Sequence, residues 1–270
     1  MNFYKDKLAF ITGGSTGIGL AIAKALAADG CHVIIFARTV SKLELAKEEI
    51  RAVAGTNNQN VHAYNVDTSD PAEVKIVFEE AIQQNGIPDL LINCVGIAQP
   101  DYFENITFDI FDKTIKTNLY STWNVCSVVA PHMESKGGYI LNTSSIAGFV
   151  GVFGYTDYCM AKFGIIGFSE ALRSELKKYH ISVSVLCPPD TDTPGYAVEN
   201  ATKPIETKAV SGNAKLLHPG FVAQVVLKEL PKKKFMIIPG VDGNFSWIMK
   251  RLFPSLVENF MDKAIRKAKI

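Results

Sequence analysis

TGGSTGIG, residues 12–19, decides the fold of this chain, and it follows the short apolar segment KLAFIT at 7–12. Gly13, Gly17 and Gly19 allow a tight turn and a close approach of the backbone to a ligand. Helical periodicity begins at Gly17, so the free N–H groups and the positive end of a helix dipole face any phosphate bound at the turn. Such a turn between a first strand and a helix predicts a dinucleotide site, with a plain tight turn as the alternative.

Apolar segments alternate with segments of helical periodicity on both sides of this turn. We expect strands at 7–12, 32–37, 60–66, 89–93, 138–143, 181–187 and 234–238. We expect helices at 17–30, 41–53, 71–86, 109–134, 157–179 and 219–229. Strands that are apolar almost throughout are typical of parallel sheets covered on both faces. The pattern predicts an α/β protein with a Rossmann-like, doubly wound, seven-stranded parallel sheet flanked by helices, and ligands at the carboxyl ends of its strands.

The composition excludes several classes of partner. The formal net charge of the 270 residues is +1, so no global field favours nucleic acid, and we expect no nucleic-acid partner. The five cysteines form no CxxC pair or metal-ligand spacing; we expect small buried thiols in a reducing compartment and no metal. No apolar run approaches the ~20 residues that cross a bilayer, and the N-terminus lacks a signal-peptide pattern. These features predict a cytoplasmic location.

Two residues bear on the choice of dinucleotide. Dinucleotide folds usually place an acid after the second strand to hold the ribose 2′-hydroxyl, but residues 37–39 read ART. Arg38 could instead pair with a 2′-phosphate, which favours NADPH/NADP+ over NADH; a solvated surface arginine is the alternative. Asp67, after the third strand, could accept from the adenine amino group, or equally form a turn with Thr68 and Ser69.

A serine, a tyrosine and a lysine suit the reduction of a carbonyl group. Tyr158 and Lys162 lie four residues apart in a helical segment and so share one face. A nearby ammonium stabilises a phenolate and lowers its pKa, which is ordinarily ~10. Ser145 follows an expected strand and could hold a carbonyl oxygen while Tyr158 protonates it. Tyr155 has no such partner, because position 159 is Cys.

With these motifs in order, the chain resembles the classical short-chain dehydrogenase/reductase family. The matching pieces are TGGSTGIG (12–19), NVDT (65–68), NCVG (93–96), Asn118 in TNLY, Ser145 in SSIAG, and YCMAK (158–162). The family commonly has Asn-Asn-Ala-Gly where this chain has NCVG, a mild departure that keeps Asn93 and Gly96.

The resemblance implies a role for each matching residue. The catalytic set falls on Asn118, Ser145, Tyr158 and Lys162, and Asn118 would help to hold a proton-relay water against the lysine. The residues expected to bind the cofactor are Gly13, Ser15, Thr16, Gly17, Ile18, Gly19, Arg38, Asp67, Asn93, Gly96, Tyr158, Lys162, Pro188, Thr191 and Thr193.

The loop PPDTDTPG, residues 188–195, ends the sixth expected strand, because its prolines cannot donate to a sheet. After this strand the family has Pro-Gly-x-x-x-Thr, which contacts the nicotinamide carboxamide. Pro188 and Thr193 match, while Pro189 replaces the glycine. The loop is thus interpreted as a nicotinamide clamp joined to a substrate loop, 188–215; an ordinary acidic reductase loop is the alternative.

The stretch PPDTDTPGYAVENATKPIET (188–207) resembles the 3-ketodihydrosphingosine reductase branch, as do VGVFGYTDY (150–158) and GIAQP (96–100). The resemblance implies NADPH-dependent reduction of 3-ketodihydrosphingosine, a lipid-like ketone, to dihydrosphingosine in sphingolipid synthesis. Asp190 or Asp192 could supply a charge opposite to the substrate ammonium. A reductase of 3-oxoacyl thioesters or steroids is the alternative, and a non-catalytic dinucleotide sensor is a further one.

The chain is expected to end in a tail, residues 245–270, that follows a single reductase domain, 1–244. Apolar residues recur along the tail at helical spacing, which predicts a C-terminal amphipathic helix that Pro254 interrupts. Residues 232–270 hold nine Lys/Arg and three Asp/Glu. Two interpretations remain open. The tail could pack on the body or on another subunit of a homo-oligomer, or it could lie peripherally on the cytoplasmic face of an anionic membrane.

Overall fold

The apolar segments form a seven-stranded parallel sheet with the strand order β3-β2-β1-β4-β5-β6-β7. The structure, a computed structural model, describes residues 2–56, 58–212 and 216–268. The strands are β1 (Leu8–Thr12), β2 (His32–Ala37), β3 (Val61–Asn65), β4 (Leu90–Asn93), β5 (Gly138–Thr143), β6 (Ile181–Leu186) and β7 (Met236–Ile237). The order reverses between β1 and β4, so a ligand crevice opens at the carboxyl ends of these strands. The predicted fold class is confirmed.

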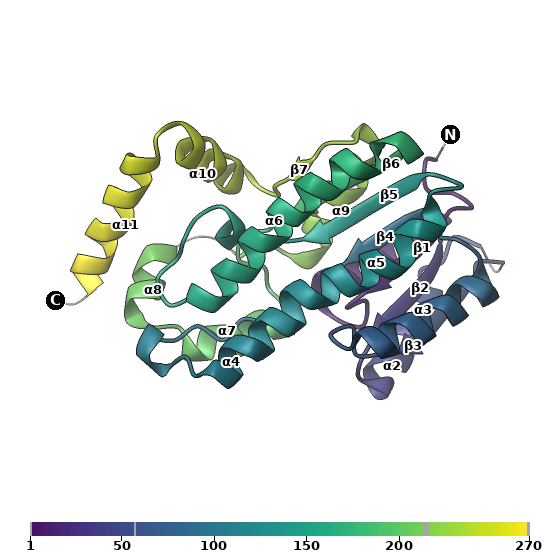
Figure 1. Cartoon of the computed structure of the whole chain (residues 1–270), viewed down its shortest axis with the longest axis horizontal. Coiled ribbons are helices and arrows are strands. Elements are labelled where there is room, and N and C mark those ends of the chain that lie inside the picture. The colour runs from purple at the N-terminus through teal and green to yellow at the C-terminus, as the bar shows by residue number, and fades with distance from the viewer. Residues whose placement is uncertain (1, 57, 213–215, 269–270) are drawn as a thin grey trace.

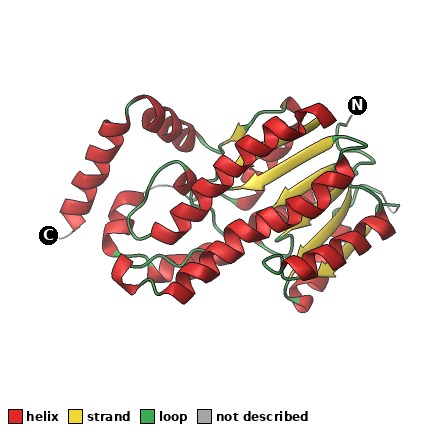
Figure 2. Cartoon of the chain, viewed as in Figure 1, coloured by secondary structure: helices red, strands yellow, loops and turns green. Residues whose placement is uncertain are grey.

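Helices cover both faces of the sheet, which lies between them in Figures 1 and 2. One face carries α1 (Gly17–Ala28), α2 (Val40–Ala52) and α9 (Pro219–Glu229). The other face carries α3 (Pro71–Asn85), α5 (Ser121–Met133) and α6 (Thr156–Leu176). With both faces covered, the strands need apolar side chains at nearly every position, which explains their uniform composition.

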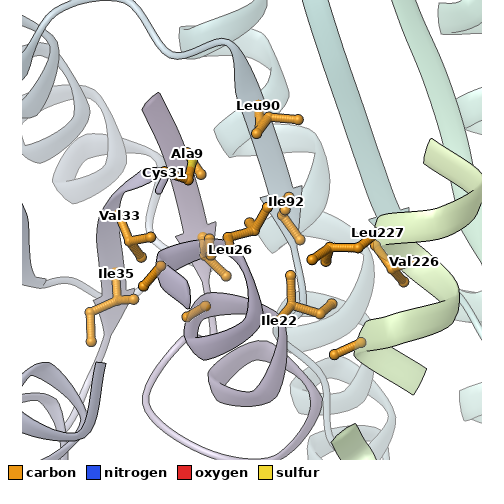
Figure 3. Close-up of a cluster of buried hydrophobic side chains, with 14 of the residues drawn as sticks. Ala9, Ile22, Leu26, Cys31, Val33, Ile35, Leu90, Ile92, Val226 and Leu227 are labelled. Carbon is orange, nitrogen blue, oxygen red and sulfur yellow. The ribbon is translucent and has the colours of Figure 1, made fainter. Parts of the chain in front are cut away.

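Two hydrophobic clusters, one on each face, hold these layers together. Because successive side chains of a strand point to opposite faces, Phe10 joins the cluster on the α3 side and Ile11 the cluster on the α1 side. In Figure 3, Ile22 and Leu26 of α1 lie near the strands and near Val226 of α9. Full burial of a large apolar side chain stabilises the folded state by about 1.5–3 kcal/mol. The clusters fix the sheet and hold the carboxyl ends of its strands in place.

The predicted helix at 109–134 has a more complex form. It consists of α4 (Phe108–Ile115), a π-helical turn at Lys116–Tyr120, and α5. A π turn inserts one extra residue into a helix and occurs frequently at functional sites. Asn118 lies in this turn.

Two helices occupy the loop expected at 188–215. They are α7 (Pro194–Thr202) and α8 (Ile205–Ser211), and residues 213–215 of the loop lie outside the described residues. Thr193 caps α7, because its hydroxyl accepts a hydrogen bond from the N–H of Tyr196 at 3.0 Å. Pro194 follows at the first helical position, where a missing N–H costs nothing. The region is therefore largely helical.

The tail is helical and is interrupted at Pro254, as predicted, and the interruption divides it into two helices. They are α10 (Val241–Leu252) and α11 (Pro254–Ala268), and residues 269–270 lie outside the described range. Pro254 has no N–H to continue α10, so the chain turns at Phe253 and a new helix begins. α11 lies beside α8 (Figure 1). Among the described residues, no helix has the length and apolarity needed to span a membrane.

One side of the tail packs on the body and the other is exposed. Trp247 makes an edge-on contact with Phe149 at 5.1 Å between ring centres, and Val257 and Met261 pack against the same cluster. The exposed apolar residues, named here the outer face, are Phe245, Ile248, Leu252, Phe253, Leu256 and Phe260. The tail therefore contributes to the core and also presents an apolar surface.

Candidate active site

The glycine turn between β1 and α1 has no room for larger side chains. Gly13 and Gly17 have φ of +65° and +58°, a region that favours glycine. A Cβ at Gly13 would lie 2.9 Å from the backbone carbon of Cys94, and one at Gly19 would lie 2.4 Å from the carbonyl oxygen of Gly13. Thr16 occupies the N-cap of α1 without a side-chain capping bond, so the N–H groups of the first turn have no capping side chain. The turn fits the pyrophosphate of a dinucleotide.

The loop after β6 meets this turn. A Cβ at Gly17 would lie only 3.2 Å from the Cγ2 atom of Thr193. The hydroxyl of Thr191 donates to the backbone carbonyl two residues earlier at 2.8 Å, and the carbonyl of Pro188 accepts from the N–H of Ile146 at 3.2 Å. The structure thus brings Pro188, Thr191 and Thr193 to the edge where the turn, with Ser15 and Ile18, also lies.

Arg38 and Asp67 lie side by side at the carboxyl ends of β2 and β3. Nη1 of Arg38 is 3.8 Å from Oδ2 of Asp67, and about half of the arginine side chain is exposed. Asp67 does form the turn considered from the sequence, because its Oδ1 accepts from the N–H and the hydroxyl of Ser69. An exposed ion pair is weak, so the guanidinium can turn toward another anion.

Asn93 is buried at the end of β4, and its side chain forms hydrogen bonds with residues of the neighbouring strands. Its amide donates to Oδ1 of Asn142 at 2.9 Å, and its carbonyl oxygen accepts from the hydroxyl of Thr12 at 3.3 Å. Asn142 donates in turn to Ser169 at 2.9 Å. This polar chain ties β1, β4, β5 and α6 together next to the crevice.

Asn118, Lys162 and Gly96 meet at one point of the site. The amide of Asn118 donates to the carbonyl oxygens of Ile97 and Thr114, both at 2.9 Å. A Cβ at Gly96 would lie 2.8 Å from Oδ1 of Asn118 and 3.1 Å from Nζ of Lys162. Glycine at this position leaves the space that the two side chains need.

Tyr158, Lys162 and Ser145 are gathered where α6 passes the end of β5. Nζ of Lys162 donates to the carbonyl of Thr143 at 3.1 Å and lies 5.4 Å from the centre of the Tyr158 ring. Burial lowers the pKa of Lys162 to about 8. Burial also raises the pKa of Tyr158 and Glu199 adds to this rise, whereas a hydrogen bond with Ser145 opposes it. The expected net lowering of the Tyr158 pKa is therefore not found.

Glu199 and Lys203 lie beside the site, although the sequence patterns did not single them out. Oε1 of Glu199 accepts from the hydroxyl of Tyr155 at 2.5 Å and lies 3.1 Å from Nζ of Lys203. The ring centres of Tyr155 and Tyr158 are 5.6 Å apart, so this pair adjoins the tyrosine of the candidate site. A glutamate four residues before a lysine in a helix is a recognisable signal. In a segment predicted to be a loop, however, this spacing does not place the two side chains together.

The two aspartates expected near the substrate have different surroundings. Asp190 is 3.1 Å from Nζ of the buried Lys203, an ammonium that it shares with Glu199. Asp192 is exposed. Asp190 is thus part of a charged cluster, whereas Asp192 is an exposed carboxylate.

Comparison with known proteins identifies the class to which this fold and site belong. A model of the short chain dehydrogenase family matches residues 7–204, so the chain belongs to this family of oxidoreductases. Membership implies a nicotinamide dinucleotide as the cofactor, in agreement with the glycine turn.

Curated relatives are similar over most of the chain. A 3-dehydrosphinganine reductase of Danio rerio is 40% identical over 86% of this chain and 71% of its own length. A 3-ketodihydrosphingosine reductase of Bos taurus is 38% identical with the same coverage. The crystal structure of levodione reductase superimposes with a TM-score of 0.79, covering 90% of this chain and 98% of that one; at 24% identity it shows the fold alone.

Proposed function

We propose that this chain reduces 3-ketodihydrosphingosine to dihydrosphingosine with NADPH, as a step of sphingolipid synthesis. The observation that carries the proposal is the similarity, at 38–40% identity over 86% of the chain, to reductases named for this substrate. The gathering of Ser145, Tyr158 and Lys162 beside a dinucleotide turn supports it, because these groups suit proton transfer to a ketone.

The proposed cofactor contacts use the residues predicted from the sequence. The glycine turn and the first turn of α1 would hold the pyrophosphate, and Arg38 would pair with the 2′-phosphate of NADPH. Asp67 would border the adenine, while Pro188, Thr191 and Thr193 would border the nicotinamide. NADPH, when bound, supplies the hydride for the reduction.

Each residue of the proposed catalytic set has one task. Ser145 orients the carbonyl oxygen of the ketone, and Tyr158 gives its phenolic proton to this oxygen as the carbonyl carbon accepts hydride. The raised pKa of Tyr158 keeps the phenol protonated before the reaction. Lys162 stabilises the phenolate that forms, and Asn118 supports the return of a proton to it.

We also propose that two parts of the chain have different roles. Residues 1–244 form the reductase unit, with the region 188–215 as its substrate loop, and 245–270 form a tail. The outer face of the tail, with the exposed basic residues Lys263, Arg266 and Lys267 of α11, suits an anionic membrane surface that delivers a long-chain substrate. Lys269, also basic, lies outside the described residues.

Self-association is a further proposal, and it rests on α5, α6 and the π turn. An apolar groove lined by residues such as Leu119 and Phe168 lies there, and Tyr120 and Trp123 on its edge are about half exposed. Such a surface suits a second copy of the chain. Light scattering should show a dimer or larger oligomer that Trp123→Glu dissociates; a monomeric wild type would contradict the proposal.

The proposed activity is tested by NADPH oxidation with a panel of 3-keto sphingoid bases, 3-oxoacyl thioesters and steroid ketones. We expect kcat/KM to be highest for the sphingoid bases. A preference for thioesters or steroids would assign the chain to another substrate. Tight NADPH binding without any turnover would make it a dinucleotide sensor.

A further inference from the structure

A charged cluster adjoins the candidate site through Tyr155, and its charges do not cancel. Asp190 and Glu199 both lie 3.1 Å from Nζ of Lys203, whose side chain is 2% exposed. Two carboxylates and one ammonium leave a formal charge of −1. Charges removed from water require a partner, so a cluster with surplus negative charge favours a cation close by.

Glu199 is the carboxylate of this cluster that adjoins the tyrosines of the candidate site, through its hydrogen bond with Tyr155. Lys203 and the hydroxyl of Tyr155 both reach Oε1 of Glu199. Within the described part of the chain, no hydrogen-bond donor reaches its Oε2. The Glu199 side chain is 18% exposed, so one carboxylate oxygen is held in place while the other can accept from a ligand.

The position of Glu199 relates it to the reacting group. Tyr155, which holds Glu199 at 2.5 Å, lies just before α6 and its ring centre is 5.6 Å from that of Tyr158. Glu199 is also the largest charged contributor to the raised pKa of Tyr158, which agrees with a short distance between the two groups. A ketone protonated by Tyr158 would therefore present its neighbouring atoms to Glu199.

We infer that Glu199 is the specificity-determining residue that binds the ammonium group of an α-amino ketone substrate. The inference rests on the proposed function, and it assigns to Glu199 the role that the sequence suggested for Asp190 or Asp192. In an α-amino ketone the charge lies on the carbon next to the carbonyl, so a carboxylate beside Tyr158 is in the right place. Lys203 and Tyr155 position this carboxylate.

The test compares two ketones that differ only in charge. They are 3-ketodihydrosphingosine and the same ketone with hydrogen in place of the amine. For the wild type we expect kcat/KM to be higher for the amino ketone. Glu199→Gln, which keeps shape and removes charge, should lower kcat/KM for the amino ketone about 10- to 100-fold and leave the neutral ketone within about twofold, as for loss of a hydrogen bond to a charged group.

Two further variants separate recognition from support of the fold. Asp192→Asn removes the charge of the other exposed carboxylate considered for this role, and it should change neither ketone; a selective loss on the amino ketone would assign recognition to Asp192 and overturn the inference. Tyr155→Phe removes a positioning contact but keeps the Glu199 charge, so the preference for the amine should persist. If Glu199→Gln does not fold by thermal melting, Glu199→Asp should show an intermediate loss on the amino ketone alone.

The outcomes can be distinguished from failure of the proposed function. If the wild type reduces neither ketone, the proposed function is wrong and the inference is overturned with it. If the wild type reduces both and Glu199→Gln lowers both equally, or leaves the preference for the amine unchanged, the proposed function stands and Glu199 only supports α7.

Discussion

Gly96 packs against Asn118 so closely that a Cβ on the glycine would lie 2.8 Å from Oδ1 of the amide. Asn118 cannot move aside at low cost, because its side chain is buried and held by hydrogen bonds to Ile97 and Thr114. The same Cβ would lie 3.1 Å from Nζ of Lys162. This contact couples the turn after β4 to two residues of the proposed catalytic set.

We therefore predict that Gly96→Ala lowers kcat by at least about tenfold, since small displacements of positioned groups strongly affect catalysis. Steady-state kinetics would measure this loss, and circular dichroism would verify the fold. Gly167→Ala is the matched control, because its Cβ meets no atom within 4 Å. Unchanged kcat in Gly96→Ala would contradict the proposed role of this contact.

Arg38 is expected to select the phosphorylated dinucleotide. Arg38→Ala should weaken NADPH binding about 10- to 100-fold, because a charge-assisted contact is lost, and change NADH binding little. Fluorescence titration with both dinucleotides measures the ratio. Arg51→Ala, a similarly exposed arginine paired with Glu48 at 3.0 Å, should leave both affinities unchanged. An equal loss for the two dinucleotides in Arg38→Ala would refute the assignment.

The pKa of Lys162 predicts a pH-dependent stability. It is about 8 in the folded chain and ~10.4 when unfolded, so between these values the unfolded state binds more protons. Below pH ~8 the buried lysine is charged, and the free energy of unfolding is lowered by the full cost of burying the ammonium. As the pH rises from ~8 toward ~10.4 this cost declines, so the free energy of unfolding of the wild type increases by up to about 1.4 kcal/mol per pH unit.

Comparison with Lys162→Met isolates this effect, because the other ionising groups are common to both proteins. Urea unfolding from about pH 7 to about pH 9.5 should show the wild type gaining stability relative to Lys162→Met above about pH 8. A difference that does not vary with pH would show that the lysine titrates normally in the folded chain.

The outer face of the tail is expected to bind anionic vesicles. Replacing Leu252 and Leu256, which are 64% and 57% exposed, by Glu should reduce binding in sedimentation assays at least about tenfold, since apolar area and favourable charge are both lost. Ile76→Glu on α3, an equally exposed apolar residue outside the tail, should have no effect.

These substitutions test the tail better than deleting it. Removal of 245–270 would also expose the cluster in which Trp247 packs on Phe149, so a loss of activity could reflect unfolding. If the double Glu variant binds vesicles as the wild type does, the outer face is not a membrane surface.

The sheet could be predicted from the sequence because its strands are apolar on both faces and its first turn has a distinctive glycine pattern. Ser145, Tyr158 and Lys162 could be proposed from their places in predicted regular elements, whereas Asn118 was proposed only from the family resemblance. Local patterns could not reveal the π turn at Asn118, since one inserted residue leaves helical periodicity almost unchanged.

The features of the site and the tail that local sequence patterns did not predict depend on tertiary contacts. Glu199 and Lys203 are four residues apart, but Tyr155 is distant along the chain, and only the packing of α7 near the start of α6 brings it to Glu199. The raised pKa of Tyr158 likewise depends on burial and on Glu199, neither of which the Tyr-x-x-x-Lys spacing contains. The break in the tail was foreseeable at Pro254, but the contact of α11 with α8 was not.

The central claim is that Tyr158 protonates the ketone of a 3-keto sphingoid base. The most direct test measures dihydrosphingosine formation from 3-ketodihydrosphingosine and NADPH by mass spectrometry, for the wild type and for Tyr158→Phe. We predict product from the wild type, a loss of at least about 100-fold in kcat for Tyr158→Phe, in keeping with removal of a general acid, and unchanged NADPH affinity. Near-normal turnover by Tyr158→Phe, or no dihydrosphingosine from the wild type, would contradict the claim.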